Sequence, residues 1–151
     1  MQIIFPLLMR IGFHPDGKIW LYPTGRDIAA FHINAFAIQS FIDKVLNHQS
    51  ADTINPVATM HYQKGLAILR QRLEEGNVET KTSDDTITAV LKLATAAHFD
   101  GDPELSRRHM QGLRRMIDMR GGLDAFAGNS RLLVEIWRYF AARLQRYEIM
   151  C

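Results

Sequence analysis

Five segments of the chain show the apolar periodicity of amphipathic helices, with turn or cap residues between them. In the first segment the apolar residues recur at spacings of three and four, which places them on one side of a helix. Those residues are Ile28, Phe31, Ala35, Ile38, Ile42 and Val45. The pattern predicts helices over about 26–46, 56–75, 84–99, 103–120 and from 130 to the end. We therefore expect an all-α fold, with about five helices in an antiparallel bundle or a short α-superhelical arrangement.

Cap residues mark the ends of the inner segments. Asn55 and Asp102 each precede a proline, the usual order of an N-cap and a first helical residue. Gly76 and Gly121 follow the last periodic residues, where C-cap glycines lie. The segment that opens at Ser83 or Asp84 is apolar on nearly all sides, so its helix is expected to be central. A polar link is expected over 78–82.

A length of 151 residues fits one domain. We divide the chain into a leading segment, residues 1–25, apolar and then turn-rich, and a helical domain, residues 26–151. The apolar stretch from Ile3 to Phe13 contains Arg10, follows no basic region and is too short to cross a bilayer. No membrane partner is therefore expected. The last amphipathic pattern is still running at the final residue, so the helical domain is expected to be incomplete.

The cysteine content and the charge of the chain limit the kinds of site and partner that it can have. The only cysteine is Cys151, so neither an intramolecular disulfide nor a cysteine-rich zinc cluster can form, and an intracellular location is expected. The 18 basic and 16 acidic residues give a net charge of +2. This near balance does not by itself call for a polyanionic partner.

A metal site is the first chemistry to weigh, because two histidines lie near an acidic turn: His98, Asp100, Asp102, Glu104 and His109. A helical zinc site places its ligands three or four residues apart on one face, whereas these histidines belong to different expected helices. The carboxylates fit a turn, an N-cap and a first-turn acid that complements the helix dipole. We expect no metal and no cofactor.

Catalytic signatures are not visible in the sequence. There is no Gly-x-Ser-x-Gly turn, the single cysteine is terminal, and Gly121-Gly122 follows a helix rather than a strand. A pair of catalytic carboxylates is not excluded, but nothing points to one. We expect no catalytic residues, and a chain that is not an enzyme.

The fourth segment carries a basic face, formed by Arg107, Arg108, Arg114 and Arg115 around Gln111. One interpretation is contact with an acidic partner, a phosphate backbone or lipid headgroups. The other is a solvated face whose arginines pair with acids of a neighbouring helix. No aromatic residue interleaves with the arginines, so stacking on single-stranded nucleic acid is not supported.

Two histidines precede glycines inside expected helices, His61 before Gly65 and His109 before Gly112. Glycine inside a helix costs about 1 kcal/mol relative to alanine, so each is expected to permit a close helix crossing. Each histidine is then expected to form a hydrogen bond across the crossing rather than to bind a metal.

One segment resembles the fungal-specific transcription factor domain, the helical regulatory region found with zinc binuclear-cluster proteins. It runs from His109 through Gly112-Leu113 and an apolar helix to Arg120-Gly121-Gly122-Leu123. Residues 86–102 and the sequence His-Tyr-Gln-Lys-Gly-Leu at 61–66 are similar to preceding parts of that family. The similarity extends from Asp27 to Tyr139 and includes no catalytic signature.

The resemblance implies a nuclear regulatory module that transmits signals to a transcription factor or joins its partners. It implies a protein partner or self-association, without sequence-specific DNA binding, because the six-cysteine zinc cluster is absent. Two alternatives stay open: a general helical adaptor or dimerisation module, and a small-ligand-binding helical domain or enzyme with a site between helices.

Overall fold

The computed structural model describes residues 26–50 and 52–149, and only the backbone of residues 142–149. The leading segment expected at residues 1–25 lies outside these residues. The elements are α2 (Ile28–Phe41), the π-helical turn η2 (Ile42–Leu46), α3 (Pro56–Glu75), α4 (Val78–Lys81), α5 (Asp84–Phe99), α6 (Pro103–Arg120), the 3-10 turn η3 (Leu123–Phe126) and α7 (Ser130–Ile149). Over these ranges the chain forms helices and no strand, which confirms the expected all-α class.

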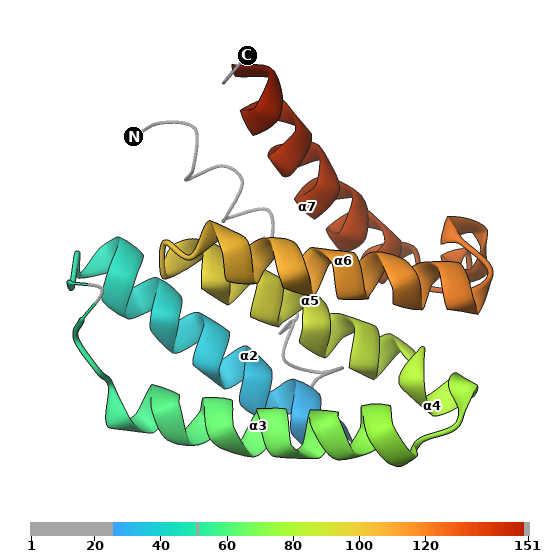
Figure 1. Ribbon diagram of the computed structural model, residues 1–151, viewed down its shortest axis with the longest axis horizontal. Coiled ribbons are helices and arrows are strands. Elements are labelled where there is room, and N and C mark those ends of the chain that lie inside the picture. Colours follow the sequence, from blue (N-terminus) through green and yellow to red (C-terminus); the bar gives the residue numbers. More distant parts are fainter. Residues whose placement is uncertain (1–25, 51, 150–151) are drawn as a thin grey trace, which may run out of the picture.

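The helices form a small bundle in which α2, α3, α5 and α6 run alternately in opposite directions (Figure 1). Helix α2 packs against both α3 and α5, and α5 packs against α6 on its other side. Helix α7 contacts α5 and η3 near its start and then leans away from the other helices (Figure 1). In the part of the chain that the structure describes, no helix is both long and apolar enough to cross a membrane.

Helix α5 is the centre of the bundle, as its composition predicted. Ten of its sixteen residues are buried, so it can be covered by α2, α6 and α7 at once. Most of the buried side chains are alanine or branched apolar residues, and Ile87, Ala89 and Ala94 are fully inaccessible. The helices that pack on α5, namely α2, α6 and α7, therefore place apolar residues against it.

The predicted N-caps are confirmed. The side-chain oxygen of Asn55 accepts hydrogen bonds from the backbone N–H groups of Val57 and Ala58, and Asp102 accepts one from Leu105. Each bond satisfies a donor that the first helical turn leaves without an intrahelical partner. Gly121 ends α6 with a φ of 108°, a left-handed conformation that glycine adopts without strain.

One expectation about chain breaks was wrong and one is confirmed. The expected polar link over 78–82 contains the short helix α4, which Asn77 caps by accepting a hydrogen bond from the N–H of Thr80. Gly76 is the C-cap of α3, as expected, with a φ of −68° and an extended backbone. The chain therefore leaves α3 extended and enters α4 at once.

The apolar stripe predicted along 26–46 is not the side that α2 buries. The side chains of Ile28 and Phe31 are 65% and 45% exposed, and the buried apolar positions are Ala29, Ala30, Ile33 and Ala37. Helix α2 lies against α3 and α5 together, and small side chains allow the backbones to approach closely. Periodicity alone selects the larger apolar residues, so it identified the wrong side of this helix.

Candidate functional site

The four arginines of the expected basic face lie on one side of α6, opposite the residues that α6 buries against α5. The buried side is formed by Ser106, Met110, Leu113, Met116 and Ile117. Spacings of three and four keep the two sets on separate faces along the helix. Arg107, Arg108, Arg114 and Arg115 are all exposed.

The two arginines nearest the start of α6 share one carboxylate. Arg107 donates to both oxygens of Glu104 at 2.9 and 2.7 Å, and Arg108 donates to Oε1 at 3.1 Å. The hydrogen bonds from Arg107 and Arg108 lower the pKa of Glu104 to about 2. The acid that the structure places beside these two arginines is Glu104 of α6 itself, whereas the solvated-face interpretation expected acids of a neighbouring helix.

The other half of the face has a different environment. Arg114 and Arg115 are exposed, and neither forms an ion pair with another residue in the described part of the chain. Met119 follows one turn after Arg115 and is 53% exposed, so an apolar side chain adjoins the charge. The middle of α6 thus presents two guanidinium groups and a thioether to solvent.

Arg120 does not belong to this face. Its guanidinium donates to the Asp84 carboxylate and to the backbone carbonyl of Thr82, and it lies over the ring of Phe126, 4.2 Å from the ring centre. These contacts hold the end of α6 against the start of α5 and against η3. Arg120 is a structural residue.

The five residues considered for a metal site are spread over different surroundings. Asp102 caps α6, Glu104 pairs with arginines, the ring of His98 lies 6.2 Å from that of Phe99, and Asp100 and His109 lie on opposite sides of a cavity. Among the residues placed by the structure, no group of three or more His, Cys, Asp or Glu side chains is arranged to hold a metal ion.

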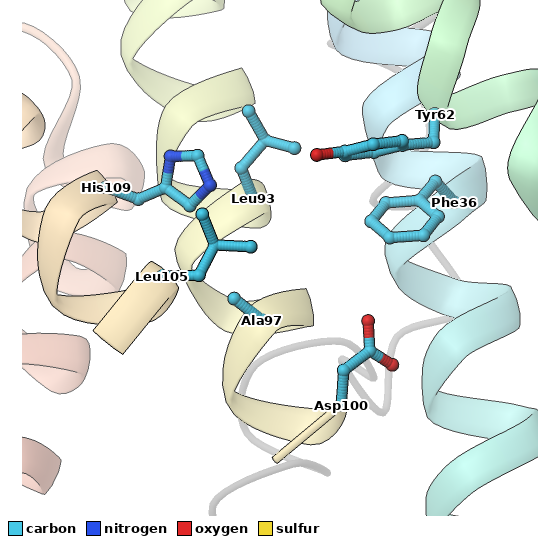
Figure 2. A pocket seen from close by; sticks show the side chains of 7 residues that line it. All are labelled: Phe36, Tyr62, Leu93, Ala97, Asp100, Leu105 and His109. Carbon is cyan, nitrogen blue, oxygen red and sulfur yellow. The ribbon is translucent and has the colours of Figure 1, made fainter. Parts of the chain in front are cut away.

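The cavity is the feature that sequence reasoning located only as an unspecified site between helices. It is lined by six residues of four helices and by Asp100, which follows α5; the six are Phe36, Tyr62, Leu93, Ala97, Leu105 and His109. In Figure 2 the Asp100 carboxylate, the Tyr62 hydroxyl and the His109 ring surround a space walled by the apolar side chains. No spacing in the sequence relates Phe36 to His109, so only the packing of the helices brings these residues together.

The expectation for His61 and Gly65 is confirmed. A Cβ atom on Gly65 would lie 2.6 Å from Cδ1 of Ile33, so only glycine fits this crossing of α2 and α3. His61 shares a hydrogen bond with His32 of α2 across the same crossing.

The parallel expectation for His109 and Gly112 was wrong. A Cβ atom on Gly112 would meet nothing within 4 Å, because Gly112 does not face a neighbouring helix. His109 faces the cavity instead, and it forms no hydrogen bond with another residue that the structure places.

Comparison with protein-family models gives a match. A family model described as the fungal specific transcription factor domain matches residues 28–142, from the first residue of α2 into α7. No curated protein and no solved structure matches the chain.

Proposed function

The chain belongs to the family of fungal-specific transcription factor domains, and we propose that it acts as a regulatory module through contacts with other proteins. The family match carries this proposal, because it covers α2, α3, α5 and α6 entirely and the first part of α7, and membership of this family supports a regulatory role in transcription. A nuclear location and a role other than catalysis agree with that membership.

Recognition of DNA through a zinc cluster has no basis in these residues. A binuclear cluster needs six cysteines, and residues 1–151 contain only Cys151. The proposal is therefore that the chain does not discriminate between DNA sequences.

The basic face of α6 is the surface that we assign to the partner. Arg114 and Arg115 are exposed and lack intramolecular ion pairs within the described residues, so an acidic segment can pair with them without breaking contacts of the fold. Met119 beside them suits an apolar side chain of the same segment. An acidic protein segment with interspersed apolar residues fits this face better than a uniform phosphate backbone does.

The proposed function is tested by fusing the full chain to a DNA-binding domain of unrelated specificity and measuring a reporter gene. We expect a change in transcription of several-fold, and we expect the double substitution R114E/R115E to remove most of it. K64E/R70E is the matched control, because it reverses two exposed charges on α3 and should leave the reporter response intact. Equal loss in both variants would mean that net charge, not the α6 face, is responsible.

Two further measurements separate this function from the alternatives. A mobility-shift assay of the unfused chain at physiological salt should show no preference among duplex sequences, and a clear preference would contradict the proposal. A tagged chain should accumulate in the nucleus. A chain that stays outside the nucleus and forms stable dimers would favour a general dimerisation module instead.

A further inference from the structure

The cavity between the helices has the size of a small organic ligand. Its volume is about 280 Å³, and it opens between α2, α3, α5 and α6. Since an apolar cavity of about 150 Å³ accommodates benzene, this one has room for about ten non-hydrogen atoms. The regulatory role proposed above makes no use of this space.

Two aromatic rings and three aliphatic side chains form most of the wall. The rings of Phe36 on α2 and Tyr62 on α3 pack together with their centres 4.7 Å apart and their planes inclined by 44°. Leu93 and Ala97 of α5 and Leu105 of α6 complete the apolar part. Aromatic faces attract cations, because the electron density of the ring is concentrated above and below its plane.

One carboxylate faces this apolar wall. The side chain of Asp100, at the end of α5, points into the cavity (Figure 2). It forms no hydrogen bond and no ion pair with any residue whose position the structure gives. Burial raises the pKa of Asp100, while the charge of Lys44 acts in the opposite direction. The ammonium group of Lys44 is held by the backbone carbonyls of Ser50 and Thr53. The carboxylate is thus left without a direct cationic partner within the described residues.

The two other polar groups of the cavity are the imidazole of His109 and the hydroxyl of Tyr62. Burial lowers the pKa of His109, which favours the uncharged imidazole, although the charge of Asp102 acts the other way. The Tyr62 hydroxyl, directed toward the same space, has no hydrogen-bond partner among the described residues (Figure 2). Both can bind a second polar atom of a ligand or an ordered water molecule.

We propose that this cavity binds a small arylalkyl ammonium ion, with the ammonium group against the Asp100 carboxylate and the ring against Phe36 and Tyr62. A cation supplies the charge partner that the half-buried carboxylate lacks, and the aromatic wall stabilises both the charge and the hydrocarbon part. A carboxylic acid would place a second negative charge beside Asp100, with only a neutral imidazole to oppose it. The proposal does not depend on the regulatory role or on the α6 face.

The test is a binding titration of the full chain by isothermal calorimetry or ligand-observed NMR. The probes are 2-phenylethylamine, 2-phenylethanol and phenylacetate, which share a phenyl ring and a two-carbon chain and differ in charge. We expect the amine to bind at least about tenfold more tightly than the alcohol, because its ammonium group can form a charge-assisted hydrogen bond with the Asp100 carboxylate. Phenylacetate should bind weakest. Equal binding of amine and alcohol, or tighter binding of phenylacetate, would overturn the proposal.

Two variants assign the binding to this cavity. Asp100→Asn keeps the shape of the side chain and removes its charge, and it should weaken amine binding about tenfold while leaving alcohol binding nearly unchanged. Asp102→Asn is the matched control, because Asp102 is exposed two residues away and asparagine caps a helix as well as aspartate does. A thermal melt of each variant checks its folding. Unchanged amine affinity in Asp100→Asn, or the same loss in Asp102→Asn, would refute the assignment.

Discussion

The Nδ1 atoms of His32 and His61 lie 2.8 Å apart where α2 crosses α3. One ring therefore donates a hydrogen bond to the other, and the accepting ring must be unprotonated at Nδ1. Phe31 covers the pair with its ring centre 5.5 Å from that of His32 and 6.1 Å from that of His61. Burial lowers the pKa of His32, and the positive charges of His61 and Lys64 add to this effect.

The first prediction is that acidification destabilises the fold through these histidines. When the pKa of a histidine is lower in the folded state than the unfolded value of 6.5, the unfolded chain binds more protons below that pH. The free energy of unfolding should therefore fall as the pH drops from 7.5 to 5.5, and His109 contributes with the same sign. Urea denaturation at the two pH values measures the effect.

The control for this prediction is His48, which is exposed and has a φ of 52°. His48→Asn should fold like the wild type, because asparagine tolerates this conformation. It leaves the pair of His32 and His61 intact, so the pH dependence of the wild type should remain. His32→Gln should reduce the pH dependence. If His32→Gln and His48→Asn respond to pH alike, the histidine pair is not a source of the acid sensitivity.

The second prediction contrasts two glycines inside helices. In Gly65→Ala the new methyl group would lie 2.6 and 2.8 Å from side-chain atoms of Ile33 and 3.2 Å from Cβ of His32. Ile33 is fully buried and stiff at its branched carbon, so α2 and α3 must separate, and we expect a net loss of about 1–2 kcal/mol. Gly112→Ala meets nothing within 4 Å and should gain about 0.5–1 kcal/mol from helix propensity.

Denaturant unfolding of both variants measures these opposite changes on one scale. The pair is informative because each change adds the same methyl group in the interior of a helix. A Gly65→Ala protein as stable as Gly112→Ala would mean that α2 and α3 do not cross as closely as the structure shows.

Helix boundaries are the part of this fold that sequence alone specified well. The expected segments at 56–75, 84–99 and 103–120 coincide with α3, α5 and α6, because Asn55, Asp102 and Gly121 cap these helices through local hydrogen bonds or conformation. The resemblance placed at residues 27–139 likewise agrees with the family match at 28–142. Caps and periodicity act within one or two helical turns, so the sequence displays them directly.

The packing partners of each helix were predicted less well, because they depend on residues far apart in the chain. The exposure of Ile28 and Phe31 follows from the position of α2 against two helices, which no periodicity reports. Asp100 and His109 were considered as metal ligands, and the structure separates them across the cavity. The aromatic part of that cavity comes from Phe36 and Tyr62, which carry no motif at all.

The third prediction concerns Asp84, which joins three helices at one end of the bundle. Its carboxylate accepts a hydrogen bond from Arg120 at the end of α6 and one of 2.7 Å from Asn129, the residue that caps α7. Burial alone would raise the pKa of Asp84, but the hydrogen bonds from Asn129 and Arg120 lower it. Because Asp84 is partly exposed, we expect Asp84→Asn to cost only about 1–2 kcal/mol.

The neighbouring Asp85 is the control. Burial raises its pKa, and the charge of Asp27 adds to this effect, so Asp85→Asn should change the stability by less than about 0.5 kcal/mol. The stabilisation from Asp84 is complete above its unfolded pKa of 3.8 and is lost as the pH falls through the lower folded value. Thermal melts of the wild type, Asp84→Asn and Asp85→Asn at neutral pH measure the difference in stability. Equal melting temperatures of the two variants would contradict the role of Asp84.

The last prediction is an asymmetry in the ion pair that attaches α7 to α5. Lys92 is buried on α5, and its ammonium group lies 3.4 Å from Oε2 of Glu135. Arg131 is 3.7 Å from the other oxygen of Glu135, so this carboxylate has a second cation beside it. Glu135→Gln removes the carboxylate that both cations face, whereas replacing Lys92 by methionine fills the same space with an apolar chain and leaves Glu135 with Arg131. We therefore expect Glu135→Gln to cost about 1–3 kcal/mol and Lys92→Met less than about 1 kcal/mol.

Urea unfolding of the two variants and of the double variant measures the coupling between the two residues. If the pair acts as the structure shows, the cost of Glu135→Gln should be smaller when Lys92 is already methionine, because the ammonium group that Glu135 faces is then absent. Additive effects of the two substitutions would instead mean that Lys92 and Glu135 act independently, and that other contacts hold α7 to α5, among them the buried Leu132 and Ile136 and the hydrogen bond from the Tyr139 hydroxyl to the Ala94 carbonyl.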